Sequence, residues 1–341
     1  MRTARARHTV FVLAALLLVL ALLSVTFGAV DISLHEIGNA LSGLFSGRNP
    51  EDLNERIFLQ IRLPRVLLGI FVGATLAVGG VLLQALFRNP IVEPGLVGTS
   101  SGAAFGAALY FVLGATWRDR LGDWALPVAA CLGGIISTAL VFYLARSRRS
   151  GHSSVVGLLL TGVAVNALFL SGVGFLSYVA RDPQARSITF WNLGTLSGAY
   201  WQAVGIVAGT TVAGYLLSRQ YAKELNALML GEQEAQLLGV SLGRLKLQVL
   251  TVNVVMVAVA TAFVGVIGFV GLIVPHFLRM LGGSDNRFLL TAGALTGAVV
   301  LTASDLAARL LVGPAELPIG IVTSVIGTPI FILLLRRTQY F

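Results

Sequence analysis

The chain has 341 residues, 56% of them hydrophobic and only 11% charged, and it carries a formal net charge of +9. Because soluble domains carry about 25% charged residues, this composition excludes a soluble enzyme, a disordered chain and a disulfide scaffold, and it indicates a multi-span membrane protein. In such a protein a basic excess is typical of cytoplasmic loops rather than of nucleic-acid binding.

Ten apolar segments follow one another along the chain, separated by short polar clusters. Most are about 17–25 residues long, the length at which a helix crosses a hydrocarbon core of about 30 Å. The expected spans are Val10–Val30, Pro64–Phe87, Gly95–Gly114, Trp124–Ala145, Val155–Val179, Leu196–Leu217, Leu247–Phe263, Gly265–Leu281, Phe288–Val312 and Ile319–Leu335. We therefore predict an all-α fold, a polytopic membrane protein with about ten transmembrane helices in a single domain over residues 1–341.

Two of these spans are special cases. The basic residues Met1–His8 precede the first span, as in a signal peptide, but Val10–Val30 is long for one and Ser24–Ala29 is a poor cleavage site, so we expect it to be retained. The eighth span, Gly265–Leu281, contains three glycines and Pro275. We expect it to cross the membrane but to be short, broken or re-entrant.

Glycine pairs four positions apart lie in three of the apolar segments. They are Gly69 with Gly73, Gly102 with Gly106, and Gly293 with Gly297. This spacing lets helix backbones approach closely, and we expect it to serve packing within one subunit rather than a dedicated dimer face.

The distribution of charge predicts the orientation of the spans. With a cytoplasmic N-terminus and ten crossings, the inside segments hold 15 basic and five acidic residues, and the outside segments hold nine and ten. Because cytoplasmic loops carry the excess of Lys and Arg, we expect both termini to be cytoplasmic.

Arginines at the outer ends of two spans are candidate functional residues, since charge at a membrane span is costly. Arg62 and Arg65 flank Pro64 at the mouth of the second span, and Arg309 lies four residues after Asp305 near the end of the ninth. These arginines could form a cationic outer rim that docks an acidic partner. Two alternatives stay open, namely interfacial anchoring and simple neutralisation of Arg309 by Asp305.

The longest cytoplasmic segment, Ser218–Lys246, contains a short amphipathic stretch bracketed by Gly231 and Gly239. We predict a helix of about two turns with Ala235 and Leu238 on one face. A helix this short needs a partner surface to be stable, so it either lies on the protein's own surface or docks a cytoplasmic subunit.

Between the second and third spans, Pro90 and Pro94 bracket Glu93 and force an extended turn before a helix rich in glycine and serine. This stretch lacks the Gly-Lys-Ser/Thr ending of a phosphate-binding loop. The four histidines have no metal-ligand spacing, and no catalytic elbow or zinc-protease motif occurs. We therefore expect no catalytic residue, no metal site and no bound cofactor in this chain.

Several motifs, in order along nearly the whole chain, resemble the permeases of ATP-binding-cassette importers for iron chelates, haem and cobalamin. The matching stretches are Arg62–Arg65, Gln84–Pro90, Glu93–Ala103, Leu230–Val240, Gly268–Arg279, Ala303–Arg309 and Glu316–Pro329. The resemblance implies a cobalamin-permease-like fold of the type II importers, in which residues 1–341 form one permease domain with a coupling segment at 218–246.

The resemblance also implies partners and site residues. Family members work as homodimers in the bacterial inner membrane, with two cytoplasmic ATPase subunits that use ATP and Mg and with a periplasmic binding protein. Arg62, Arg65 and Arg309 match arginines that dock the binding protein. The residues matching the ATPase-coupling helices are Leu230, Gly231, Glu232, Ala235, Leu238 and Gly239, and those matching the cytoplasmic gate are Asn89, Ile91, Ser153 and Ser154.

The implied function is import by alternating access, in which the chain is a transport subunit and not the enzyme that hydrolyses ATP. The stretches Phe87–Pro90, Ser100–Ala104 and Phe190–Gly194 are most similar to haem permeases, which favours haem as cargo. A ferric-siderophore or cobalamin permease is the alternative within the family. An ion-coupled secondary transporter is the alternative from another class, and the scarcity of carboxylates in the middle of the spans disfavours it.

Overall fold

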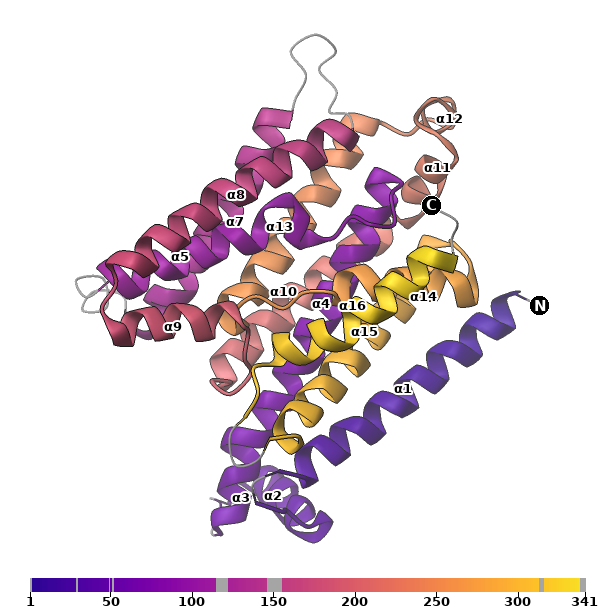
Figure 1. Ribbon diagram of the computed structural model, residues 1–341. Coiled ribbons are helices and arrows are strands. Elements are labelled where there is room, and N and C mark those ends of the chain that lie inside the picture. Colours follow the sequence, from indigo (N-terminus) through magenta and orange to yellow (C-terminus); the bar gives the residue numbers. More distant parts are fainter. Residues whose placement is uncertain are drawn as a thin grey trace.

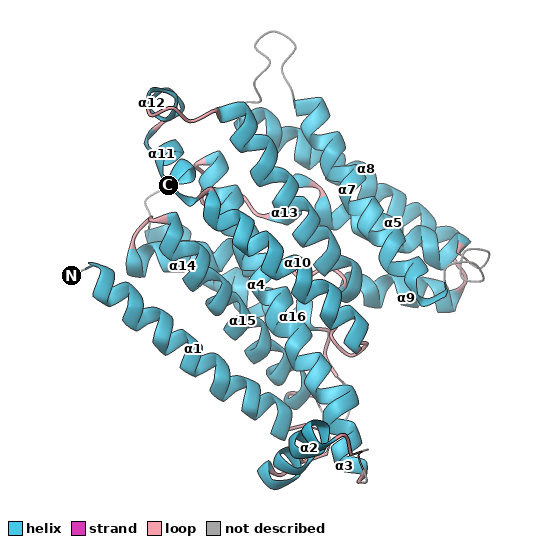
Figure 2. Ribbon diagram, turned by 180° about the vertical axis from the view of Figure 1, so that it is seen from behind, coloured by secondary structure: helices cyan, strands magenta, loops and turns pink. Residues whose placement is uncertain are grey.

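A computed structural model of the chain describes residues 2–28, 30–48, 50, 52–114, 122–145, 155–312 and 316–337. Among these residues the structure contains helices and no β-strand (Figures 1 and 2). The predicted all-α fold class is confirmed.

Each expected span coincides with a helix. These helices are α1 (Arg2–Thr26), α4 (Leu63–Phe87), α5 (Thr99–Leu113), α7 (Ala125–Ala145), α8 (Val155–Val179), α10 (Trp201–Gln220), α13 (Leu242–Val264), α14 (Val270–Gly282), α15 (Asn286–Leu310) and α16 (Ile319–Arg337). The shorter elements are α2 (Leu34–Ser46), α3 (Leu53–Ile57), the π-helical turn η1 (Phe58–Arg62), the 3₁₀ turns η2 (Pro94–Val97) and η3 (Gly122–Trp124), α9 (Asp182–Asn192), α11 (Ala222–Leu230) and α12 (Glu232–Leu237).

By length and composition alone, six of the described stretches can cross a membrane. They contain α1, α4, α7, α8, α13 and α15. The apolar helices α5 and α14 and the apolar part of α16 are shorter, and α10 has 20 residues but is not among the six. The predicted number of about ten spans is therefore approximate.

Helix α4 forms the centre of the bundle, with α15, α10, α13 and α14 packed around it (Figure 1). Gly73 on α4 and Gly297 on α15 face each other so closely that a Cβ on either would collide with the carbonyl of the other. Gly102 on α5 and Gly133 on α7 make the same kind of contact. For Gly73, Gly102 and Gly297 the expected packing within one subunit is confirmed.

The eighth span is interrupted, as its glycines predict. The chain is irregular over residues 265–269 and has positive φ at Gly265 (76°) and at Phe269 (69°), so that α14 begins only at Val270. A helix of 13 residues measures about 20 Å, which is less than a hydrocarbon core of about 30 Å. The segment Gly265–Leu281 is thus a broken span rather than one continuous helix.

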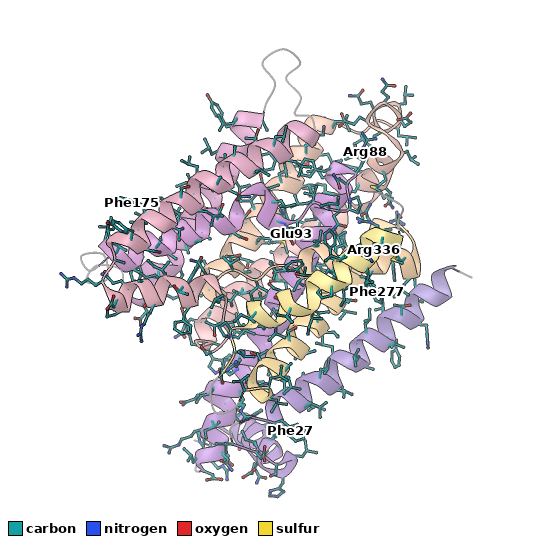
Figure 3. All side chains as sticks on the ribbon, in the orientation of Figure 1. Phe27, Arg88, Glu93, Phe175, Phe277 and Arg336 are labelled. Carbon is teal, nitrogen blue, oxygen red and sulfur yellow. The ribbon has the colours of Figure 1, made fainter. Side chains whose placement is uncertain are left out.

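The two ends of the molecule carry different elements. Helices α2 and α3 lie at one end, whereas α11, α12, the start of α1 and the end of α16 lie toward the other (Figures 1 and 2). Phe27 and Arg88 mark these two ends (Figure 3). A capping box between Ser33 and Glu36 starts α2, and Gly47, at a φ of 67°, ends it. The predicted orientation makes the α2–α3 end the outer one.

Candidate functional site

Three arginines predicted to dock a partner meet at the α2–α3 end of the molecule. Arg62 leaves the π-helical turn that precedes Pro64. Its guanidinium donates to the carbonyl oxygens of Val25 (2.9 Å), Phe27 (2.7 Å) and Val30 (2.5 Å). Carbonyls at a helix C-terminus lack partners within the helix, so Arg62 satisfies the end of α1.

Arg309 completes the same end of α1. It donates to the carbonyl oxygens of Phe27 (3.0 Å) and Ser24 (2.9 Å) and to the Ser24 hydroxyl (2.5 Å). Its Nε also donates to Asp305 Oδ2 at 3.1 Å. The ion pair between Asp305 and Arg309 that the sequence left open as an alternative is therefore present.

Arg65 joins the network through two carboxylates. Its Nε and Nη2 lie 3.0 and 2.9 Å from Asp305 Oδ1, and its Nη1 lies 2.8 Å from Glu316 Oε2. Asp305 is 2% exposed and Arg65 is 8% exposed. These charge-assisted, bidentate contacts connect α4 and α15 with Glu316, which precedes α16. We call Arg62, Arg65, Arg309, Asp305 and Glu316 the arginine cluster.

The three arginines of the expected cationic rim have partners within the chain. Arg62, Arg65 and Arg309 are buried in the chain by itself and point at carbonyls and carboxylates within it. Their role in docking a binding protein stays a prediction.

The predicted coupling residues lie at the opposite end of the molecule. Helix α12 is bracketed by Gly231, at a φ of 151°, and Gly239, at a φ of 84°, as the sequence indicated. Glu232 is ion-paired with Lys246 at 2.8 Å. Ala235 is buried in the core.

The apolar face predicted for this helix is different in the structure. Leu238 follows the last residue of α12 and is exposed, so it does not share the buried side with Ala235. Leu230, Leu237 and Leu238 are 70%, 89% and 65% exposed. Leu230 is the last residue of α11, Leu237 is the last residue of α12 and Leu238 follows it, and we call these three exposed leucines the leucine knob.

Two of the residues predicted to form the gate, Asn89 and Ile91, belong to the connection between α4 and α5, which we call the gate segment (Arg88–Gly98). Asn89 Oδ1 accepts a hydrogen bond from the Ile91 amide at 3.0 Å, which fixes the first turn of this segment. Ile91 is exposed. Ser153 and Ser154 lie outside the described residues, so the second part of the predicted gate stays a prediction.

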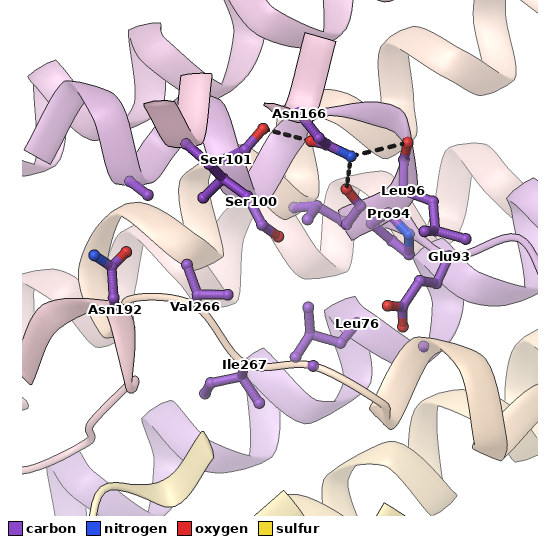
Figure 4. A pocket seen from close by; sticks show the side chains of 16 residues that line it. Leu76, Glu93, Pro94, Leu96, Ser100, Ser101, Asn166, Asn192, Val266 and Ile267 are labelled. Carbon is purple, nitrogen blue, oxygen red and sulfur yellow. Dashed lines mark hydrogen bonds between the residues drawn. The ribbon is translucent and has the colours of Figure 1, made fainter. Parts of the chain in front are cut away.

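A cavity of about 580 Å³ lies beside the gate segment (Figure 4). Its wall is contributed by α4, the gate segment, α5, α8, the end of α9, α13 and the irregular stretch before α14. The lining residues are Leu76, Glu93, Pro94, Gly95, Leu96, Ser100, Ser101, Ala104, Asn166, Leu170, Asn192, Val257, Val266, Ile267, Gly268 and Gly271. We call this space the central cavity.

Asn166 on α8 connects the gate segment to the cavity wall by hydrogen bonds. Its amide donates to the carbonyl oxygens of Gly95 (3.3 Å) and Leu96 (3.4 Å), and its oxygen accepts from the Ser101 hydroxyl at 2.5 Å (Figure 4). These bonds connect the 3₁₀ turn of the gate segment to α5 and α8.

Glu93 fastens the other side of the gate segment. The backbone N–H of Phe269, at the start of α14, donates to its carboxylate. Glu93 lies outside the spanning helices, and its burial raises its pKa from 4.5 to about 7. The hydrogen bond from Phe269 lowers this pKa, but by less than burial raises it. Glu93 is the one ionisable residue among the cavity-lining residues that the structure describes.

Sequence reasoning missed the roles of Asn166, Asn192 and Glu316. The two asparagines line the cavity, and Glu316 pairs with Arg65 from a distant part of the chain. A polar residue inside an otherwise apolar helix is a usable signal for Asn166. Glu316 offered no comparable signal, because its partner lies 251 residues away.

A bundle of apolar helices with a mostly apolar pocket beside an irregular, glycine-rich break is typical of a multi-pass membrane transport protein. Residues 16–337 match the FecCD transport family, and the chain belongs to that family. The resemblance to permeases of ATP-binding-cassette importers of the type II class is thereby confirmed.

Relatives span most of the chain. The hemin transport system permease protein HmuU of Yersinia pestis is 40% identical over 324 residues, 95% of this chain and 94% of that protein. The cobalamin import system permease protein BtuC of Halobacterium salinarum is 42% identical over 82% of this chain and 73% of that protein. A solved structure titled as a metal-chelate type ABC transporter in an inward-facing conformation is 32% identical, with a TM-score of 0.83 over 96% of this chain and 98% of that one.

Proposed function

We propose that this chain is the membrane-spanning subunit of an importer that carries haem across the bacterial inner membrane. In this proposal two copies form a homodimer, two ATPase subunits bind the cytoplasmic face, and a periplasmic binding protein delivers the cargo. The observation that carries the proposal is the near full-length similarity to a hemin permease. The chain itself then moves cargo and its ATPase partner uses ATP and Mg.

Alternating access would proceed through the described elements. A loaded binding protein docks at the α2–α3 end, and ATP binding and hydrolysis in the partner move α11 and α12. The two permease copies rock so that the outer end and the gate residues Asn89 and Ile91 open in turn. The exposed leucine knob supports this assignment, because exposed leucines on a very short helix suit a partner surface.

Uptake into proteoliposomes tests the proposal. The full transporter should accumulate haemin only with the binding protein outside and ATP available to the ATPase subunits. Uptake by the chain alone, in ATP-free vesicles driven by an ion gradient, would instead identify a secondary transporter.

The leucine knob allows a matched pair of variants. Leu238→Ser should abolish most binding-protein-stimulated ATP hydrolysis and weaken co-purification of the ATPase. Leu34→Ser is the control for co-purification of the ATPase, because Leu34 is similarly exposed, at 69%, but lies on α2 at the opposite end. Equal losses of co-purified ATPase in both variants would contradict a coupling role for the knob.

Docking at the α2–α3 end needs a test that leaves the buried arginines in place. Replacing surface glutamates on the two lobes of the binding protein by glutamine should weaken its affinity for the permease, and added salt should reduce the difference. An affinity that is insensitive to both changes would remove Arg62, Arg65 and Arg309 from the docking site.

Cobalamin is the second candidate cargo, favoured by the 42% identity to a cobalamin permease. The spectrum of the ligand that co-purifies with the cognate binding protein separates the two candidates, since a haem absorption band and an iron-free corrinoid spectrum differ plainly.

A further inference from the structure

The central cavity combines an apolar wall with a small set of polar groups. Besides backbone, its polar side chains are Glu93, Ser100, Ser101, Asn166 and Asn192. Ser101 and Asn166 are engaged with each other and with the gate segment. In the part of the chain that the structure describes, no side-chain hydrogen bond involves Ser100 or Asn192. Glu93, Ser100 and Asn192 are thus the side chains left to meet a molecule in the cavity.

Among the residues that the structure describes, the Glu93 carboxylate has no cation beside it. The lining residues from α4, α5, α8, α9, α13 and the stretch 266–271 include no Lys, Arg or His and no second acid. Its carboxylate is directed into the open space of the cavity (Figure 4). It is held only by the Phe269 N–H.

An unpaired carboxylate in a mostly apolar cavity discriminates strongly between cargo groups. A hydrogen-bond donor placed beside it is stabilised, whereas a second carboxylate is repelled with little water to screen it. Selectivity then arises from rejecting one group as much as from attracting another.

We propose that Glu93 selects which part of the cargo enters the central cavity: ionised, it accepts hydrogen-bond donors and rejects carboxylates, and a cargo carboxylate passes only beside a protonated Glu93. This inference rests on the proposed import function and adds the residue that sets its chemical preference. Ser100 and Asn192 supply neutral hydrogen-bonding groups on the same wall.

Two pairs of probes isolate the carboxylate from the scaffold that carries it. Haemin and haemin dimethyl ester share one ring system, and only haemin has free carboxylates. Cyanocobalamin and its monocarboxylic acid differ by one amide turned into a carboxylate. The measured quantity is the uptake ratio of the neutral to the acidic member, in proteoliposomes with the complete transporter.

Glu93→Gln is the principal variant, because glutamine keeps the shape and an acceptor for Phe269 but cannot ionise. Glu224→Gln on α11 is the control, an acid-to-amide change outside the cavity lining. Asn192→Asp is the converse variant, since it adds a carboxylate to the same wall. Comparing ratios between variants with one binding protein cancels that protein's own preference.

In Glu93→Gln we expect the neutral-to-acidic uptake ratio near pH 8 to fall about tenfold, the change in binding that one pKa unit of interaction between two charges produces. Asn192→Asp should raise the ratio, and Glu224→Gln should leave it at the wild-type value. The wild type should favour acidic probes as pH falls. Since the pKa of Glu93 is about 7, its protonated fraction changes about 30-fold between about pH 6 and pH 8.5.

The wild-type pH profile needs no variant, so the proposal can be tested even if Glu93→Gln fails to fold. A ratio unchanged by Glu93→Gln, or a wild-type ratio independent of pH, overturns the role of Glu93 while leaving import intact. Uptake of the corrinoid pair alone, with the expected Glu93 effect, overturns haem as the cargo and supports the selectivity. Failure of all four probes to bind the reconstituted transporter overturns both.

Discussion

The arginine cluster contains paired charges, whereas the central cavity contains an unpaired one. In the cluster, three arginines meet two carboxylates and the carbonyls that end α1. In the cavity, Glu93 has one backbone N–H and no cation. Matched charges hold helices together, whereas an unmatched charge costs stability and marks a candidate functional position.

The largest expected effect comes from breaking the matched region. Asp305→Ala leaves Arg65 and Arg309 facing each other without their shared carboxylate. We expect a loss of about 3–5 kcal/mol in the free energy of unfolding, because an uncompensated charge is left buried. Denaturant unfolding of the purified chain in detergent measures it, and a loss below about 1 kcal/mol would show that the cluster does not hold the fold.

Removing the unpaired charge of Glu93 should instead raise the free energy of unfolding. The pKa of Glu93 rises from 4.5 to about 7 on folding, so its ionisation opposes folding as pH rises through that window and the full cost applies above it. Glu93→Gln should therefore stabilise the chain by about 3 kcal/mol near pH 8, with no difference below about pH 4.5. Thermal unfolding across this pH range checks it. Destabilisation at pH 8 would mean that the carboxylate has a partner cation.

A smaller effect should follow from loosening the cavity wall. Asn166→Ala removes the donor to Gly95 and Leu96 and the acceptor for Ser101. We expect a cost of about 1–2 kcal/mol and faster amide hydrogen exchange in the gate segment. Thr161→Ala, whose hydroxyl bonds only within α8, is the control. Unchanged exchange over residues 93–98 would show that α8 does not hold the segment.

The smallest effect should come from the rim of the arginine cluster. Glu316→Gln removes one charge from a pair whose glutamate is 43% exposed, and Arg65 keeps Asp305. We expect a loss of no more than about 0.5–1 kcal/mol, since water and salt screen exposed pairs. An effect as large as that of Asp305→Ala would place Glu316 inside the matched network.

Much of the helical framework could be predicted from the sequence. Each apolar segment matches a helix. Backbone groups in a bilayer must form their hydrogen bonds within their own segment, so the length of an apolar segment predicts a spanning helix. Gly231 and Gly239 bracket α12 as expected, since positive φ favours glycine. The glycines of 265–271 likewise predicted the break before α14.

The direction in which side chains point was harder to predict from the sequence. The sequence suggested that Arg62, Arg65 and Arg309 face outward, yet their partners come from the end of α1, from α15 and from Glu316. Ala235 and Leu238 are three positions apart on a helical pattern, but α12 ends before Leu238.

Composition and spacing by themselves determined that this chain is a helical, multi-span membrane protein, because hydrophobic length and glycine spacing are local properties. The transport role came from the motifs that it shares with a permease family. Only the tertiary structure decided which charges are paired. Arg65 and Asp305 are 240 residues apart, and Glu93 faces a cavity assembled from seven different parts of the chain. Whether a charge is matched depends on what packing brings beside it, and no local pattern of residues records that.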